Sequence, residues 1–229
     1  MSLSEIAHQY DRFYRRYEKK YEKKISREIR NQILTYWETK YVSAEKMTQI
    51  IRELHLDAGM NWAKMNRLNK SRFSDYMFPL LRTYMIMDAL NAGEQITQTT
   101  IDYVKDILYQ ATILNWSLDY LRNELLRVEY IRFRGLLIAR TELTYSTNLA
   151  TYILNTNQQE NKQKRWVSLL DSKTRRDHRI LNNQVRGINE PFEVVNKRGV
   201  TVKMDYPGDR SYGAGPEQIC NCRCFLIYE

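Results

Sequence analysis

The chain has 229 residues, of which 43% are hydrophobic and 28% are charged, and its formal net charge at pH 7 is +9. This apolar content excludes a mainly disordered chain, and because no apolar run approaches the ~18 residues of a membrane span, an integral membrane protein is excluded as well. The N-terminal segment alternates charges without an apolar core, so no secretory signal is expected. The positive excess favours a polyanion or an acidic protein surface as partner.

Glycine and proline divide the chain into two parts. Most of the 8 glycines and 4 prolines, and all 3 cysteines, lie in residues 187–229. Since both residue types interrupt regular helices, the shift predicts an α+β fold. We expect a mostly helical N-terminal region over residues 1–135, followed by a small α+β module over 136–229 with a hairpin and a closing strand. The limit between residues 135 and 136 follows from the resemblance given below.

The first helix is predicted over about residues 3–39. Ser2 and Glu5 have capping-box spacing, and apolar residues then recur at steps of three and four along one helix face. The residues of this stripe are Tyr10, Phe13, Tyr14, Tyr17, Tyr21, Ile25, Ile29 and Ile33. We expect the stripe to be buried.

Basic side chains fill the other faces of this helix, with nine positive and four negative residues in 11–30. The candidates for DNA contact are Arg12, Arg15, Arg16, Lys19, Lys20, Lys23 and Lys24. The pattern has two interpretations: a solvated face on a packed helix, or a basic helix that lies against DNA or an acidic partner.

Apolar periodicity predicts further helices along the chain. The second helix begins near Ser43, the third spans about 71–91 and the fourth about 99–114. Ser117 could cap a fifth helix, and a long apolar-periodic segment runs from about 129 to 155. Pro79 is expected to start or kink the helix at 71–91, and Gly93 to follow its end. His8 and His55 have no ligand-like neighbours and are expected to be surface or simply hydrogen-bonded side chains.

Polar motifs cluster after residue 139. Arg140 and Glu142 are two apart in the long helix, so they should point to different faces and each reach a neighbouring element. A polar linker is predicted over 155–164. Trp166, Leu169 and Leu170 are then expected to anchor the next segment to the core.

A short helical unit is predicted after Leu170. Asp171 fits an N-cap with Thr174 at the third helical position, and Arg175 and His178 would share a face because they are three apart. Gly187 is expected to end the unit.

Strand signals dominate the last part of the chain. Two β-branched runs flank a turn within 192–204 and predict a hairpin, and a Gly/Pro-rich loop follows over 206–216. Residues 219–228 are β-prone, and in a strand Cys220, Cys222 and Cys224 would lie on one face.

Together these motifs resemble the phage Mu F-like minor head protein family, also called phage head morphogenesis proteins. The matching residues are Ile138-Ala139-Arg140-Thr141-Glu142, Trp166, Asp171, Thr174-Arg175-x-x-His178, Gly187, Phe192, Pro207-Gly208-Asp209 and Asn221-Cys222-Arg223-Cys224, in the family's order and spacing. The resemblance covers about residues 136–229. A helical region before this module is usual in the family.

The resemblance implies a structural minor head protein of a tailed phage. Such proteins are present in few copies inside the head, are associated with the portal protein, and in some cases are ejected with the genome. The implied localisation is the virion, assembled in the host cytoplasm, with packaged double-stranded DNA and other head proteins as further partners. No enzyme activity is implied, and since the chain ends just after the cysteine motif, no fused toxin domain is expected.

The cysteines raise the question of a metal. Some relatives carry a four-ligand set that resembles a structural zinc site, but this chain has Arg175 and Ile219 at two of those positions. The remaining ligand types are His178, Cys222 and Cys224, with the additional Cys220. A zinc site is one interpretation. The other is that the thiols are small core residues, with no cofactor and no disulfide.

Two roles are open for the segment around Asp171. One is a structural clasp, in which Asp171 accepts from Arg175 or His178 and ties the helix to the final strand. The alternative is a nucleic-acid-cleaving enzyme that uses Asp171, Arg175 and His178 for acid–base chemistry. We expect the clasp because no second histidine or paired acidic metal site accompanies these residues. A cellular DNA-binding or scaffold role in a prophage remnant is a third interpretation.

Overall fold

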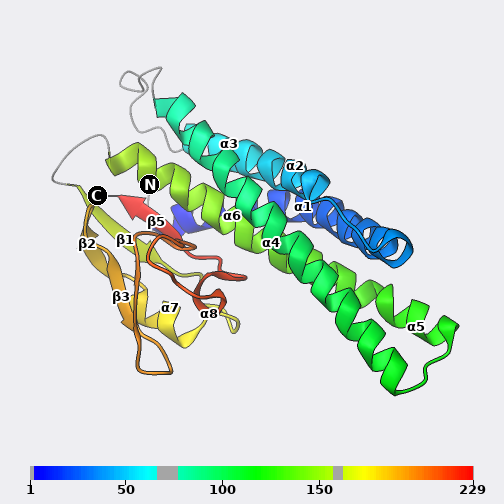
Figure 1. Ribbon diagram of the computed structural model, residues 1–229. Helices are drawn as coiled ribbons and strands as arrows, with labels where there is room; N and C mark the ends of the chain where they lie inside the picture. The colour runs from blue at the N-terminus through cyan, green and yellow to red at the C-terminus, as the bar shows by residue number, and fades with distance from the viewer. Residues whose placement is uncertain (1–2, 66–76, 157–161, 229) are drawn as a thin grey trace.

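The structure, a computed structural model, describes residues 3–65, 77–156 and 162–228. Its helices are α1 (Leu3–Thr39), α2 (Glu45–Leu54), the π-helix η1 (His55–Gly59), α3 (Met60–Met65), α4 (Met77–Ile113), α5 (Leu118–Leu125), α6 (Val128–Thr156), α7 (Arg176–Leu181) and α8 (Pro216–Ile219). Its strands are β1 (Gln163–Val167), β2 (Val185–Gly187), β3 (Phe192–Val195), β4 (Thr201–Met204) and β5 (Phe225–Tyr228). Helices therefore precede small antiparallel sheets, and the α+β class is confirmed (Figure 1).

The first helix has the predicted limits, and every residue of its predicted apolar stripe is buried. The stripe packs mainly against α6, and α1, α4 and α6 run alongside one another as the long helices of the molecule (Figure 1). Gly135 in α6 allows this close approach, because a Cβ there would meet Oγ of Ser26 in α1 at 2.1 Å.

The prediction of two helices over 71–91 and 99–114 is wrong. From Met77 onward one helix, α4, continues to Ile113, and residues 71–76 lie outside the described residues. Gly93 does not end a helix but lets α4 contact α2, since a Cβ there would lie 2.6 Å from Cα of Thr48. Pro79 lies in the first turn, where a missing N–H costs no helical hydrogen bond. The predicted cap of α5 is confirmed, because Oγ of Ser117 accepts the N–H of Tyr120.

The strands form two antiparallel sheets, one with the order β2-β1-β5 and one that is the predicted hairpin of β3 and β4. The predicted linker 155–164 is wrong at its end, because β1 begins at Gln163; residues 157–161 lie outside the described residues. The final strand is shorter than predicted. Residues 220–224 precede β5 as an irregular segment in which Asn221 has a φ of 55°, so the three cysteines do not line one face of a strand.

Two apolar clusters form the core, and α6 contributes to both. Its first half packs with α1, α2 and α4, and its second half packs with the strands, among them Trp166, Phe192 and Leu226. The predicted anchor Leu170 is instead 49% exposed, with a φ of 52°. The boundary expected at residue 135 falls inside α6, and the division into two regions stays a prediction. Among the described helices, none is long and apolar enough to span a membrane.

Candidate functional site

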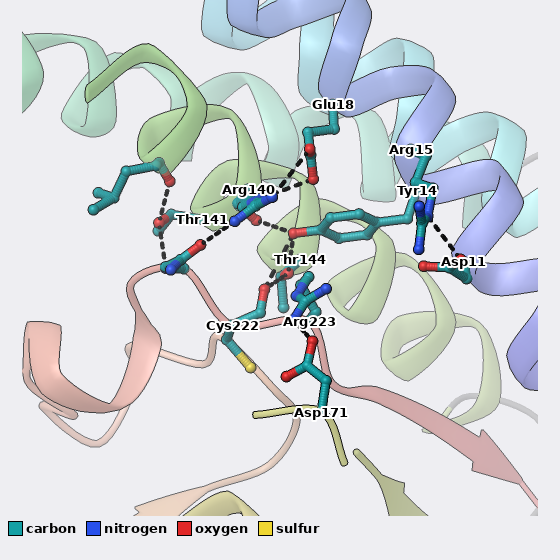
Figure 2. Close-up of polar contacts among 12 residues, drawn as sticks. Asp11, Tyr14, Arg15, Glu18, Arg140, Thr141, Thr144, Asp171, Cys222 and Arg223 are labelled. Atoms are coloured by element: carbon teal, nitrogen blue, oxygen red, sulfur yellow. Dashed lines mark hydrogen bonds and ion pairs between the residues drawn. The ribbon is translucent and has the colours of Figure 1, made fainter. Parts of the chain in front are cut away.

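The segment before β5 is attached to α6 by side chains of that helix (Figure 2). Oγ1 of Thr141 accepts the backbone N–H of Asn221 at 2.9 Å, and the hydroxyl of Thr144 donates to the carbonyl of Cys222. From α1, the hydroxyl of Tyr14 lies 3.1 Å from the same carbonyl. The loop carbonyl is therefore held by two helices at once.

The same attachment continues toward β5. Asn148 of α6 donates to the carbonyl of Cys224 at 3.0 Å and accepts the N–H of Leu226 at 3.0 Å. Tyr10 of α1 stacks on Phe225, with ring centroids 4.4 Å apart. Because Asn148 supplies both a donor and an acceptor, it continues the hydrogen bonding of the sheet onto the helix.

Arg140 and Glu142 reach different elements, as their spacing predicts. Arg140 of α6 binds Glu18 of α1 with two donors, at 2.9 and 3.2 Å, and a third donor reaches Oδ1 of Asn221 at 3.2 Å (Figure 2). Both side chains of the Arg140–Glu18 pair are 16% exposed. A two-point guanidinium–carboxylate pair with low exposure fixes direction as well as distance. Arg140 thereby joins α1, α6 and residues 220–224, which we call the cysteine segment.

Glu142 belongs to a second, more deeply buried network. One carboxylate oxygen lies 3.0 Å from Nε2 of His55 in η1, and the other accepts from Arg210 at 2.7 Å. Asp88 of α4 lies 3.6 Å from Arg210 and 4.0 Å from Nδ1 of His55. The sequence predicts that His55 is either a surface residue or a hydrogen-bonded one; it is fully buried and hydrogen-bonded.

The charges in this network set the protonation of its acids. Burial would raise the pKa of Glu142, but Arg210 and His55 outweigh it and lower the pKa to about 2. At Asp88 burial dominates and raises the pKa in spite of Arg210. The network therefore holds Glu142 as the counter-ion of Arg210 in the interior.

Asp171 closes the cysteine segment on its outer side, but it does not act as predicted. It is not an N-cap, because α7 begins at Arg176 and Arg175 is its N-cap. Oδ1 of Asp171 instead accepts from Thr174 and from the N–H of Lys173 in a turn. Its other oxygen pairs with Arg223 (Figure 2). The expectation that Asp171 accepts from Arg175 or His178 is wrong.

Arg175 and His178 contact the same segment separately. Arg175 donates to the carbonyl of Cys220, while His178 is buried beside Trp166. In the part of the chain that the structure describes, no hydrogen bond or ion pair joins Asp171, Arg175 and His178 to one another.

His178, Cys222 and Cys224 converge on one buried point. Nδ1 of His178 lies 3.4 Å from Sγ of Cys222 and 3.5 Å from Sγ of Cys224. Oγ of Ser168 lies 3.3 Å from Sγ of Cys224. Burial raises the pKa of Cys222; at Cys224, hydrogen bonds from Cys222 and His178 outweigh the effect of burial and lower the pKa. The predicted fourth group, Cys220, is half-buried and does not belong to this cluster.

These three side chains fit a zinc ion. Zinc bonds of about 2.3 Å to sulfur and about 2.05 Å to nitrogen at a tetrahedral angle place ligand atoms about 3.6 Å apart, close to the observed separations. A cavity of about 20 Å³ beside the cluster has room for one water, which needs roughly 10–15 Å³. His178, Cys222 and Cys224 would hold the metal, and a water would complete the four ligands.

The predicted DNA-binding residues of α1 differ in their surroundings. Arg15 pairs with Asp11 in the same helix, and Lys20 and Lys24 pair with acids of η1 and α2. The others are exposed and have no acidic partner among the described residues: Arg12, Arg16, Lys19 and Lys23. Their steps of four, three and four residues place them on one helix face. Four cations of the predicted seven thus remain as a continuous stripe.

The remaining motif residues described here lie in the strands and at their ends. Trp166 in β1 and Phe192 in β3 are fully buried and meet edge to face, with centroids 5.4 Å apart. Gly187 ends β2 in a turn whose N–H is accepted by Glu190. Sequence reasoning missed Lys164, which is fully buried and donates to Asp205 at 2.9 Å. Lys164 and Trp166 are two residues apart, so in a strand their side chains lie on the same face. The expected burial of Trp166 was therefore the signal that Lys164 is buried too.

In a comparison with protein families, the family model described as phage Mu protein F like protein matches residues 83–227. The match begins within α4, so it extends further toward the N-terminus than the motifs indicate. Neither the curated proteins nor the solved structures contain a match to this chain.

Proposed function

The chain belongs to the phage Mu F-like family, a family of structural phage head proteins, and from this premise we propose that it is a minor head protein of a tailed bacteriophage. It acts inside the head or at the portal, in head morphogenesis or genome ejection. The family match over residues 83–227 is the observation that carries this proposal.

The chemistry of the motif residues supports a structural role. Arg140, Thr141 and Asp171 bind backbone or charged groups of the same chain, and His178 is enclosed by Trp166 and the cysteines. Side chains engaged in this way stabilise one arrangement of helices and strands, as a small module requires. The stripe of Arg12, Arg16, Lys19 and Lys23 supports contact with packaged DNA.

The end of the molecule farthest from the strands supports contact with another head protein (Figure 1). Large apolar side chains are at least 58% exposed there, at the end of α4, in the connection that follows it and at the start of α5: Tyr109, Ile113, Leu114 and Leu118. Exposed apolar side chains that are close together typically mark protein contacts. We assign this end to the portal contact.

Co-purification of the chain with the portal protein tests the proposal. Leu114→Ser with Leu118→Ser should abolish co-purification and incorporation into heads, while the fold is retained because both side chains are exposed. The matched control, Leu90→Ser with Met87→Ser, removes exposed apolar side chains from the middle of α4 and should leave both unchanged. Absence of the wild-type chain from purified particles would contradict the proposal.

The enzyme alternative is tested separately. The purified chain should leave labelled DNA and RNA intact, with and without divalent metal. Cleavage that is lost in His178→Ala would instead establish a nuclease.

A further inference from the structure

Lys164 of β1 is a fully buried lysine that no part of the head-protein role uses. Its Nζ lies 5.0 Å from the ring centroid of Tyr152 in α6 and 5.5 Å from that of Phe192 in β3. Lysine is almost never buried to this degree unless it is paired. Its partner is Asp205, which follows β4 and whose Oδ1 lies 2.9 Å from Nζ. The pair therefore connects the two sheets.

Burial changes where the protons of this pair lie. It lowers the pKa of Lys164. Three carboxylates act in the opposite direction and are outweighed: Asp205, Asp209 and Glu190. Because an ammonium ion loses its hydration in the interior, the neutral amine is more accessible there than in water, and the neutral amine is the nucleophilic form. The proton that leaves Nζ passes along the hydrogen bond to Oδ1 of Asp205, which converts the ion pair into an amine beside a carboxylic acid.

Hydroxyl donors hold the other oxygen of the Asp205 carboxyl group. The hydroxyl of Tyr212 donates to Oδ2 at 3.1 Å, and the hydroxyl of Tyr152 is also hydrogen-bonded to Asp205. Asp205 raises the pKa of Tyr212, and burial together with Asp205 raises the pKa of Tyr152, so both hydroxyls stay protonated. Such donors stabilise the negative charge that develops on a carbonyl oxygen when its carbon is attacked. Asp209 accepts the backbone N–H of Asp205 at 2.7 Å and thereby fixes the residue that carries the carboxyl group.

The amine and the carboxyl carbon are close together and confined. Since a C–O bond is about 1.2 Å long, a nitrogen 2.9 Å from Oδ1 lies within about 4 Å of Cγ. Attack requires a separation of roughly 3–3.5 Å, so a movement of about 1 Å or less is sufficient. The side chain of Lys164 is 0% exposed and that of Asp205 is 12% exposed. This confinement replaces the high concentration that amide formation requires in solution.

We propose that Lys164 and Asp205 condense to an isopeptide bond between Nζ and Cγ, with the release of one water. The lone pair of Nζ attacks Cγ, and the π electrons of the carbonyl move to Oδ2, to which Tyr212 donates. A proton then passes from Nζ to the Oδ1 hydroxyl, the double bond to Oδ2 forms again, and Oδ1 leaves as water. One hydrogen stays on the amide nitrogen, and the net charge of the pair is zero before and after, so no further reactant is needed.

The bond ties β1 to the end of β4 and closes a loop between residues 41 positions apart. A covalent link of this kind restricts the unfolded chain and so stabilises the fold. It also replaces two desolvated charges by a neutral group, which removes the desolvation penalty of a buried ion pair. This modification does not depend on the role of the chain in the phage head.

The intact mass of the purified, folded chain tests the bond. We expect a mass lower than the sequence mass by one water, and a tryptic digest in which the peptides of Lys164 and Asp205 form one branched product. The pair of Lys203 and Glu193 is the control within the same chain. Its atoms are 2.8 Å apart, but the side chains are 51% and 46% exposed, so both charges stay hydrated and their peptides should not be joined.

Two substitutions of Asp205 distinguish condensation from other losses of water. Asp205→Asn should lose ammonia in place of water and give the same isopeptide bond, whereas Asp205→Ala should keep its full mass. Tyr212→Phe removes the donor to Oδ2, and we expect bond formation in freshly synthesised chain to slow by about tenfold or more. Tyr84→Phe, which changes a tyrosine of the same 51% exposure, should react at the wild-type rate.

Two results would overturn the proposal. One is a wild-type chain that keeps its full sequence mass after prolonged incubation in the folded state, and the other is a loss of water that digestion places outside Lys164 and Asp205. In both cases the two side chains form an ion pair only. Equal rates for Tyr212→Phe and Tyr84→Phe would overturn the part assigned to Tyr212. None of these measurements depends on particle incorporation, so failure here and failure of the head-protein role are distinguishable.

Discussion

Single hydroxyl and amide groups attach the cysteine segment to the helices. Tyr14, Thr141, Thr144 and Asn148 all bind its backbone, which lies irregularly and has few partners of its own. Buried backbone groups must be paired, so these side chains replace a strand ladder. The dependence of a loop on single side chains makes its stability sensitive to the loss of one atom.

Tyr14→Phe isolates one of these atoms. The ring stays buried, while the hydroxyl that lies 2.8 Å from the carbonyl of Arg140 and 3.1 Å from that of Cys222 is removed. We expect the free energy of unfolding to fall by about 1 kcal/mol, since Thr144 still donates to Cys222. Chemical denaturation measures this change, with Tyr41→Phe, at a side chain 71% exposed, as the control. Equal stability of wild type and Tyr14→Phe would show that the hydroxyl is not needed.

The zinc interpretation makes a different prediction at the same segment. Chain purified with zinc should contain one ion per molecule, and a chelator should lower its melting temperature, because the metal binds only the folded state, in which the three ligand atoms are close together. Cys222→Ser should lose the ion, whereas Cys220→Ser should retain it, since Cys220 lies outside the cluster of ligand atoms. If the protein contains no metal and neither zinc nor chelator changes its melting temperature, the zinc interpretation is wrong and the thiols are core residues.

Glu142 predicts how stability depends on pH. Its pKa is about 2 in the folded protein, below the ordinary value of 4.5, so the ionised form stabilises the fold. This contribution is complete above the unfolded pKa and is lost as the pH falls from about 4.5 toward 2. Glu142→Gln should therefore lower stability at neutral pH and flatten its decline over that interval. Urea denaturation at several pH values measures both effects, and Glu129→Gln, at an exposed position, should leave the profile unchanged.

The sequence predicted this site in part. It placed Arg140 and Glu142 on different faces, because helix geometry alone decides that. It could not give Arg223 as the partner of Asp171, or Arg210 as the partner of Glu142, since those pairs join residues 52 and 68 positions apart. The sequence predicts a polar linker at Lys164 because a charged residue is rarely fully buried without a partner, and its partner Asp205 is distant in sequence.

Apolar periodicity predicts the limits of a helix correctly where the helix is amphipathic, but the prediction fails where a glycine lies inside a helix. The limits of α1 follow from its continuous apolar stripe. The sequence predicts a helix end at Gly93, but this glycine allows close packing, which only the position of α2 reveals. The closing strand was predicted too long because β-propensity cannot anticipate that helix side chains would bind the backbone of residues 221–224.

Gly93→Ala distinguishes the two meanings of that glycine. In an exposed helix this change stabilises by about 1 kcal/mol. Here the new Cβ would lie 2.6 Å from Cα and 2.8 Å from N of Thr48, so α4 and α2 must separate and the melting temperature should fall. Asn91→Ala, two residues earlier on an exposed position of α4, should leave it unchanged or raise it. A rise in melting temperature for Gly93→Ala would show that Gly93 is not in close contact with α2.

For the molecule as a whole, binding to DNA depends on where the positive charges lie as well as on the net charge of +9. Arg15, Lys20 and Lys24 pair with acidic side chains of the fold, whereas the stripe of Arg12, Arg16, Lys19 and Lys23 is exposed without an acidic partner among the described residues and is available to meet phosphates. Duplex DNA should therefore bind weakly at low salt, with a log–log salt slope of about −0.9 for each phosphate contacted.

Two variants that remove equal charge separate the stripe from net charge alone. Arg16→Gln with Lys23→Gln should reduce the slope by about 1.8, because both stripe residues lose their phosphates. Lys20→Gln with Lys24→Gln should change it less, since these side chains already bind Asp57 and Glu53. Filter retention of labelled duplex DNA across a salt series measures both. An identical change in the two variants would attribute binding to net charge, and no retention at low salt would mean that the stripe meets a protein or only solvent.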